Sequence, residues 1–202
     1  MKYLFYPLLI FSLLLASCIG IDAESNIRAD GTIQLKLVYS VSKAVDELGR
    51  LGANEVYFPL PVGRDDLQLA AGRSGAELRS WNRNDTDDKI IITANLDFPD
   101  PDSFAAFLDP AGGMAKFSKS NGLNTLTLTL TRGTTVAEPD FLEFIKAVFG
   151  DYEIALNFKL PGTNVNANGF TLNGNNASFK MKAADVYSSP KALVLSLNWQ
   201  NS

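Results

Sequence analysis

Apolar and polar residues alternate along several stretches of the chain, and this period of two is typical of β-strands with one buried face. The clearest stretches are residues 31–41, 89–98, 123–132, 152–160 and 192–199. Threonines fill the polar positions of the third stretch, and threonine is favoured on the exposed face of a sheet. Because sheets with one solvent-exposed face are usually antiparallel, the pattern predicts a mainly antiparallel β-sheet.

Turn and helix signals fall between these stretches. Asn121-Gly122 and Asn173-Gly174 are dipeptides that favour the type I′ turn of a β-hairpin. Other segments begin with capping or acidic residues, carry apolar side chains at helical spacing and end near glycine or proline. The segments expected to form short helices are 42–48, 65–72, 103–108 and 139–150.

The chain shows no internal repeat, and its strands and short helices are mixed along the sequence. We therefore predict an α+β fold with a mainly antiparallel β-sheet and several short helices packed on one face. Residues 31–202 are expected to form a single domain, because their number lies in the usual range for one hydrophobic core.

The first 17 residues differ from the rest of the chain. Lys2 gives a basic start, and residues 3–16 are almost all apolar. The small residues Ala16 and Ser17 then lead into Cys18. Such a pattern is typical of a secretory signal peptide, and the apolar run is too short to span a bilayer. Residues 1–17 are therefore expected to be removed after export.

The sequence Leu15-Ala16-Ser17-Cys18 resembles the lipobox of bacterial lipoproteins. The resemblance implies cleavage before Cys18, a diacylglyceryl thioether on its sulfur, and acylation of the new N-terminus, for example with palmitate. Two or more acyl chains hold a protein stably on a membrane. The alternative is an ordinary cleavage site beside a buried thiol. Cys18 is the only cysteine, however, and secreted proteins rarely keep an unpaired one.

The residues after the cysteine affect both anchoring and localisation. Residues 18–30 are polar with no clear periodicity, so a lipidated N-terminus followed by a flexible tether is expected. Ile19 stands where an aspartate tends to retain enteric lipoproteins in the inner membrane. Its presence favours the outer membrane in an organism that has one, and the chain is expected to be membrane-anchored in the cell envelope.

Composition narrows the classes of function. The chain has 18 basic and 22 acidic residues, a net charge of −4, which gives no electrostatic reason to bind nucleic acid. It has no histidine, and its one cysteine is assigned to the lipid. Cys/His zinc sites, Ser-His-Asp or Cys-His catalysis and histidine acid–base chemistry are thereby excluded. We expect no enzyme activity, catalytic residue, metal or cofactor.

One group of carboxylates is a candidate calcium-binding site. Asp85, Asp87 and Asp88 lie close together, but an EF-hand loop starting at Asp85 needs glycine at its sixth position and glutamate at its twelfth. Ile90 and Leu96 occupy those positions. A solvated turn is therefore the better interpretation.

A second group, Asp97, Asp100 and Asp102, surrounds two prolines. Paired carboxylates at a suitable separation can hydrolyse glycosides, which leaves a carboxylate enzyme as a third-ranked hypothesis. Aspartate before a helix is also a good cap, and Asp102 or Ser103 is the expected cap here. The capping interpretation is favoured because the sequence fixes no separation between the acids.

Two further groups have both a structural and a functional interpretation. Phenylalanines on helical faces are expected to pack in the core, but some could line an apolar pocket for an acyl chain. Asparagines near the C-terminus suit tight turns, and they could also bind sugar hydroxyls. The pocket candidates are Phe104, Phe107, Phe141 and Phe144, and the asparagines are Asn164, Asn166, Asn168, Asn173, Asn175 and Asn176.

Residues 154–181 run as an alternating strand into Pro161-Gly162, then through Asn168-Gly169 and Asn173-Gly174 to Phe179. This layout resembles the LppM-type lipoprotein domain, in which a strand ends in Pro-Gly, an Asn-Gly turn and a further hairpin follow, and an aromatic residue stands at the position of Phe179. The resemblance extends over about residues 31–200. It implies an envelope-anchored α+β domain with a suspected role in binding lipids or glycolipids, and it supplies no catalytic residues.

These observations predict a membrane-anchored, non-enzymatic envelope lipoprotein that binds a lipid or glycolipid. The alternative is a structural or interaction lipoprotein, such as an assembly factor or surface antigen, that binds envelope protein partners. Both stay open, because an apolar pocket and a packed core have the same sequence pattern.

Overall fold

Two β-sheets share one hydrophobic core in the computed structural model, which describes residues 19–43, 61–133, 142–143, 146 and 150–201. The larger is sheet A, with seven strands, and the smaller is sheet B, with four. Their inward side chains belong to a single cluster that includes Tyr39 and Phe98 of sheet A and Trp199 of sheet B. Each sheet therefore has one face on the core.

Sheet A is mixed, because all its neighbouring strands are antiparallel except β1 and β7, which run parallel. In a parallel pair the connection has to cross over, and here more than a hundred residues, including two of the four strands of sheet B, separate the two strands. The order across the sheet is β3 (Glu77–Asp85), β4 (Lys89–Phe98), β2 (Ile33–Ser42), β1 (Ile19–Ile27), β7 (Glu153–Lys159), β10 (Asn176–Lys182) and β9 (Thr171–Asn173).

Sheet B is entirely antiparallel. Its inward side chains Leu126, Leu197 and Trp199 are at most 2% exposed, so this sheet covers part of the core rather than standing apart. Its order is β5 (Ala115–Ser120), β6 (Leu123–Thr131), β11 (Leu193–Gln200) and β8 (Thr163–Asn168).

Three described helices are short: α3 (Arg64–Arg73), α4 (Pro101–Leu108) and α6 (Ala183–Tyr187). α3 contacts β3, α4 contacts β4 and β5, and α6 contacts β10 and β6. Within the described ranges, none of the helices is long and apolar enough to cross a membrane.

The prediction of antiparallel strands with a few short helices is confirmed. The hairpin of β5 and β6 has the expected turn, since Asn121 (φ 51°) and Gly122 (φ 79°) both adopt the left-handed conformation that a type I′ turn requires. The division into two sheets was not predicted. The expected helix at 42–48 lies outside the described residues beyond Lys43, as does most of 139–150.

The residue that caps the N-terminus of α4 differs from the predicted one. Asp100, rather than Asp102 or Ser103, precedes the helix and accepts a hydrogen bond from the backbone N–H of Ser103 at 2.7 Å. Pro101 is the first helical residue, where its missing N–H costs nothing.

The prediction of a flexible tether over residues 18–30 is wrong for residues 19–27. They form β1, which lies inside sheet A between β2 and β7. Ala23 and Ile27 are 8% and 3% exposed. The signal was present but weak, because glycine and serine interrupt an alternation that otherwise sets Ile21, Ala23 and Ile27 against polar neighbours.

Candidate functional site

The outer face of sheet A, which points away from the core, contains an open hollow of about 950 Å³. Six adjacent strands line it, from β3 through β4, β2, β1 and β7 to β10. Its volume lies within the range of ligand-binding clefts. Its exposed side chains belong to two rows that cross the sheet and continue beyond the hollow at β3; strand register fixes both rows.

The first row lies on the side of the β1–β2 turn. Strand pairing aligns Asn26 with Gln34 and Gln34 with Asp97 on one side, and Asn26 with Lys159 on the other. The complete row, from β10 to β3, is Asn176, Lys159, Asn26, Gln34, Asp97 and Glu77.

The second row lies two residues further along each strand, since alternate residues share a face of a sheet. Glu24 aligns with Lys36 and with Asn157, and Lys36 aligns with Asn95. The complete row is Ser178, Asn157, Glu24, Lys36, Asn95 and Ser80.

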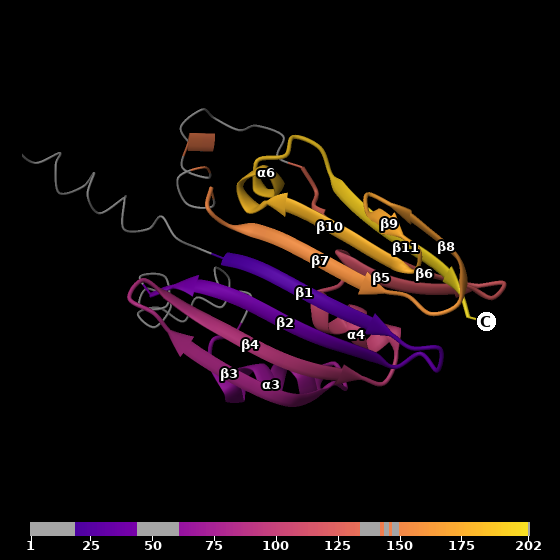
Figure 1. Cartoon of the computed structure of the whole chain (residues 1–202), viewed down its shortest axis with the longest axis horizontal. Helices are drawn as coiled ribbons and strands as arrows, with labels where there is room; N and C mark the ends of the chain where they lie inside the picture. The colour runs from indigo at the N-terminus through magenta and orange to yellow at the C-terminus, as the bar shows by residue number, and fades with distance from the viewer. Residues whose placement is uncertain (1–18, 44–60, 134–141, 144–145, 147–149, 202) are drawn as a thin grey trace, which may run out of the picture.

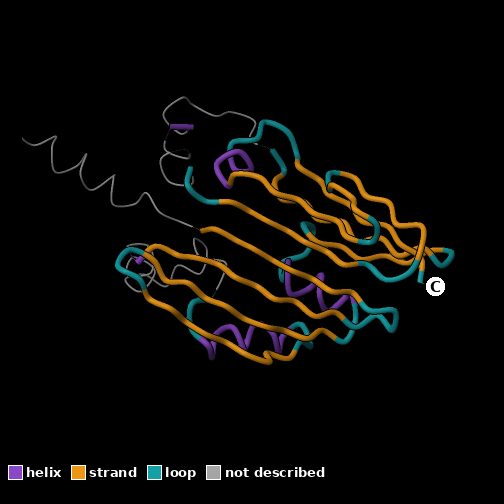
Figure 2. The backbone as a smooth tube through the Cα atoms, viewed as in Figure 1, coloured by secondary structure: helices purple, strands orange, loops and turns teal. Residues whose placement is uncertain are grey.

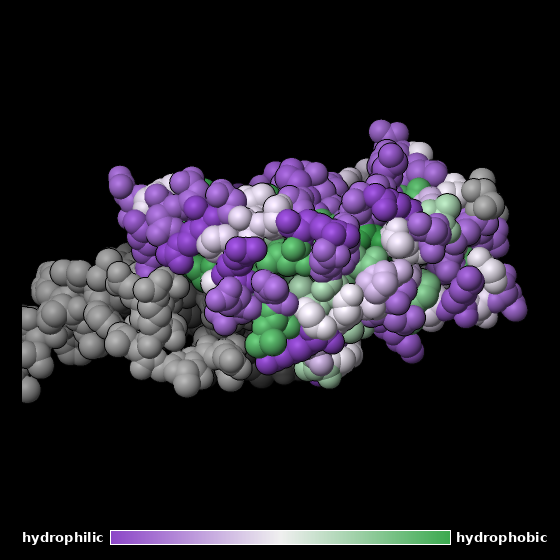
Figure 3. Space-filling model, turned by 90° about the horizontal axis from the view of Figure 1, so that it is seen from below, coloured by the Kyte–Doolittle hydropathy of each residue, from purple (hydrophilic) through white to green (hydrophobic). Residues whose placement is uncertain are grey.

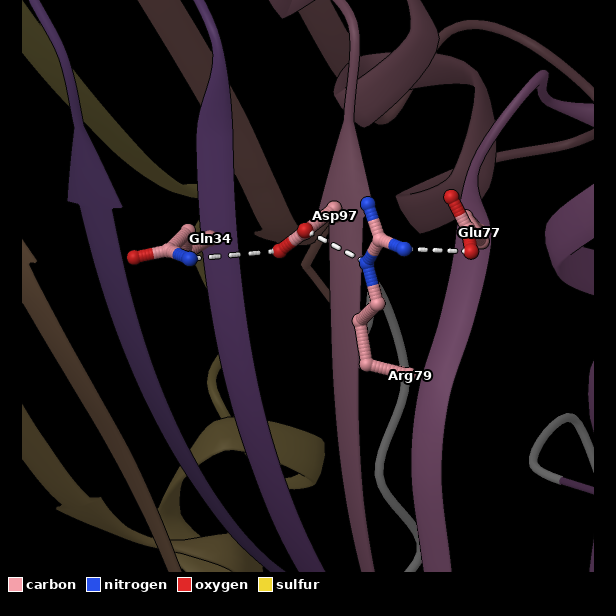
Figure 4. Close-up of polar contacts among 4 residues, drawn as sticks. All are labelled: Gln34, Glu77, Arg79 and Asp97. Atoms are coloured by element: carbon pink, nitrogen blue, oxygen red, sulfur yellow. Dashed lines mark hydrogen bonds and ion pairs between the residues drawn. The ribbon is translucent and has the colours of Figure 1, made fainter.

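A polar network closes the β3 end of the first row (Figure 4). Arg79 Nε donates to Asp97 Oδ2 at 2.7 Å, and Arg79 Nη1 pairs with Glu77 Oε1 at 2.5 Å. Gln34 Nε2 donates to the other oxygen of Asp97 at 3.4 Å. The hydrogen bond with Asp97 raises the pKa of the Arg79 guanidinium. An irregularity in β3 between Leu78 and Ser80 lets Arg79 join this face.

The charges of the second row are also paired. Lys36 Nζ lies 3.2 Å from Glu24 Oε1, and Asn95 Nδ2 donates to Ser80 Oγ at 2.7 Å. Lys159 differs, because no described residue forms an ion pair with it. The hollow is thus rich in amides and paired charges, and Lys159 adds a cation towards β10 that has no ion-pair partner among the described residues.

This chemistry suits a ligand with many hydroxyl groups. Asparagine and glutamine offer both donors and acceptors, the carboxylates accept, and lysine and arginine donate. All these groups stand on paired strands rather than on loops, so their spacing is set by the sheet. The hollow offers no hydrophobic side chain that is exposed, since its apolar members are at most 3% exposed; they are Leu35, Leu96, Phe158 and Ala177.

The phenylalanines predicted to line a pocket are placed differently. Phe104 is 1% exposed, and its ring meets those of Phe98 at 5.2 Å and Phe158 at 6.3 Å between centroids. The Phe107 ring lies 5.3 Å from that of Phe98, and neither Phe104 nor Phe107 lines the hollow. Phe141 and Phe144 lie outside the described residues. The apolar pocket therefore stays a prediction.

The lipobox residues Leu15, Ala16, Ser17 and Cys18 also lie outside the described residues, so lipidation stays a prediction. The acidic groups are used in local contacts. Asp97 binds Arg79, Asp100 caps α4, and Asp85 pairs with Arg83 at 2.6 Å. In the part of the chain that the structure describes, no group of three or more acidic, cysteine or histidine side chains could hold a metal ion.

Some of the candidate asparagines serve the fold. Asn166 and Asn168 pair with β11 in sheet B, and Asn175 Nδ2 donates to the carbonyl of Gly162 at 2.8 Å. Among the five of these asparagines whose side chains the structure describes, which leaves out Asn164, only Asn176 lines the hollow. Sequence reasoning missed Glu24 and Asn26, because the segment that carries them was interpreted as a tether.

Comparison with known proteins supports the fold alone. No protein-family model matches this sequence, and no curated protein matches it. Among solved structures, the chain is similar to the NMR structure of the folded domain of the Mycobacterium tuberculosis LppM protein, with a TM-score of 0.50 and 13% sequence identity. The match covers 93% of this chain and 92% of that one.

Proposed function

We propose that this chain is a membrane-anchored, non-enzymatic lipoprotein of the bacterial cell envelope that binds a lipid or glycolipid through the polar hollow of sheet A. The hollow carries the proposal, because its two rows of amides and paired charges would engage the hydroxyl-rich headgroup. The lipobox-like sequence before Cys18 supports the anchor. The fold shared with the LppM domain agrees with the resemblance of residues 154–181.

A glycolipid fits the hollow better than an acyl chain does. An acyl chain needs exposed apolar walls, and the apolar residues of this hollow are buried beneath its polar side chains. Sugar hydroxyls can replace water on the amides of Asn26, Asn95 and Asn157 without leaving a polar group unpaired. Lys159 adds a cation for a headgroup that carries phosphate.

The anchor is tested on the protein extracted from its own membrane. Intact mass spectrometry is expected to show a chain that begins at Cys18 and carries the added mass of a diacylglyceryl group and an acyl chain. A mature chain beginning at any other residue, or an unmodified Cys18, would contradict the anchor.

Binding is tested by co-flotation of residues 19–202 with vesicles made from envelope lipids. Asp97→Asn removes the negative charge and one of the two oxygens that accept from Arg79 and Gln34, so a loss of about tenfold in affinity is expected, which corresponds to about 1.4 kcal/mol. Glu153→Gln is the matched control, because Glu153 is also ion-paired on sheet A but lies outside the hollow. Equal binding by both variants would exclude the hollow as the site.

A second candidate function, binding of a protein partner, is favoured by the surface around α3. Leu69 is 57% exposed there, beside a shallow depression lined by Gln68 and Gly72. The face seen from below is mostly hydrophilic, with hydrophobic residues gathered near its middle (Figure 3). If no lipid binds, a Leu69→Asp variant that loses a complex recovered from detergent extracts would support an interaction lipoprotein.

A further inference from the structure

No residue lies between the lipid site Cys18 and the first residue of β1, so the domain has no flexible tether there. The first residue of β1 is Ile19, which directly follows Cys18, and consecutive Cα atoms are only about 3.8 Å apart. Ile19 is already paired with Val41 of β2. We propose that the end of sheet A at which β1 starts is held against the bilayer surface, with the strands rising away from it. This inference rests on the lipid anchor proposed above.

The surface concerned, here called the anchor end, follows from the register. β2 ends there, since Val41 pairs with Ile19, and β4 begins there, since Ile90 pairs with Val41. On the other side, β7 begins and β10 ends, because Glu153 pairs with Lys182. The free end of β1 and these neighbours lie on one side of the molecule in Figure 1.

The outer face of sheet A changes character towards the anchor end. At the level of Gly20, strand pairing aligns Ser40 and Ile91, and the next level carries Val38 and Ala155 on either side of the exposed Asp22. Charges also lie on β7 and β10 at this end, where Glu153 forms ion pairs with Lys180 and Lys182. The anchor end thus combines small or apolar side chains on the central strands with lysines that are already paired, and such a surface can approach lipid headgroups without leaving these lysines unpaired.

Charge does not set the orientation. The anchor end carries both lysines and acidic residues, and these include four of each, namely Lys43, Lys89, Lys180, Lys182, Asp22, Asp87, Asp88 and Glu153. Asp87 and Asp88 lie in the adjoining β3–β4 turn, where the carbonyl of Asp88 accepts a hydrogen bond from Lys43 N at 3.0 Å. The two signs offset each other, so anionic lipid would exert little net attraction. The short covalent connection orients the domain, which predicts an orientation that salt leaves unchanged.

The orientation restricts the ligand of the hollow. At about 3.3 Å per residue, Glu24 and Asn26 stand about 20–26 Å from the anchored cysteine along β1. A compact phospholipid headgroup in the same leaflet does not rise to that height, whereas the glycan of a glycolipid with several sugars does. The hollow therefore selects extended headgroups.

Energy transfer from the full-length lipidated protein to acceptor-labelled lipid headgroups in phosphatidylcholine vesicles tests the orientation. The fluorophore is attached to a cysteine introduced by Asp87→Cys at the anchor end, or by Ala29→Cys in the β1–β2 turn at the opposite end; both positions are exposed. Strong transfer from position 87 and weak transfer from position 29 are expected. Equal transfer from both positions would overturn the proposal.

Two controls separate the possible failures. Inserting a long Gly-Ser linker between Cys18 and Ile19 is expected to abolish the difference, and a difference that survives would show that other contacts orient the domain. The unaltered protein should not react with the thiol dye, because its only cysteine carries lipid. Dye on the unaltered protein would overturn the anchor itself, whereas an unlabelled protein with equal transfer would overturn only the orientation.

Discussion

Ile27→Ala tests whether the residues after the lipid site are part of the folded domain. Ile27 ends β1, pairs with Ile33 and is only 3% exposed. The substitution removes three buried carbon atoms, at about 0.8 kcal/mol each, and leaves a cavity that adds to the cost. The expected loss in free energy of unfolding is about 2–4 kcal/mol, a large part of the total stability of an ordinary domain.

Urea unfolding of residues 19–202, followed through the fluorescence of the buried Trp199, measures this loss. With a slope of about 2 kcal/mol per molar urea, the midpoint should fall by about 1–2 M. The control is Asp22→Asn, which alters an exposed position of the same strand and should change the free energy by less than about 0.5 kcal/mol. If Ile27→Ala were as mild as Asp22→Asn, β1 would not be part of the core.

Three local features give further expectations. Asp100→Ala removes the cap of α4 and should cost about 1 kcal/mol in urea unfolding. Gly122→Ala places a side chain at φ 79° and should cost about 1–2 kcal/mol by the same assay. Hydrogen bonds from the backbone N–H groups of Met114 and then Ala115 lower the pKa of Asp109 below 3.8. The ionised Asp109 carboxylate therefore stabilises the folded protein above pH 3.8, and this contribution is lost as the pH falls through the lowered pKa of the folded state. Asp109→Asn should flatten the acid side of a plot of urea midpoint against pH. An unchanged slope would contradict this role.

The strongly alternating strands could be predicted from the sequence because each has a polar face and a buried face. β4 is the clearest case: its predicted bounds, 89–98, match Lys89–Phe98. The two-residue turn at Asn121-Gly122 could be predicted equally well, since few dipeptides adopt the left-handed conformation at both residues. Strands of this kind and two-residue turns are determined by neighbouring residues in the sequence, so they can be predicted without knowledge of the tertiary structure.

β1 and β8 were missed for a different reason. Both contain polar or small residues that are poor strand formers, and they are strands because their neighbours supply the pairing. β8 is rich in asparagine yet pairs with β11, and β1 is held between β2 and β7. Tertiary context, rather than propensity, determines these segments.

The candidate site was not predictable for the same reason. Its two rows combine residues from six strands that are far apart in the sequence, and only the order and register of sheet A bring them together. The phenylalanines predicted to line a pocket show the reverse case. Phe104 packs against Phe98 and Phe158, so the core interpretation of its helical position holds.

Binding of a glycolipid in the hollow of sheet A is tested most directly by native mass spectrometry of residues 19–202, exported behind a conventional cleavable signal and purified gently from the periplasm. We expect an adduct with the mass of a glycolipid with several sugars, which is reduced in Asp97→Asn and retained in Glu153→Gln. A clean ligand-free mass that persists after incubation with envelope lipid extracts, or an adduct that Asp97→Asn leaves unchanged, would show that the hollow is not a glycolipid site.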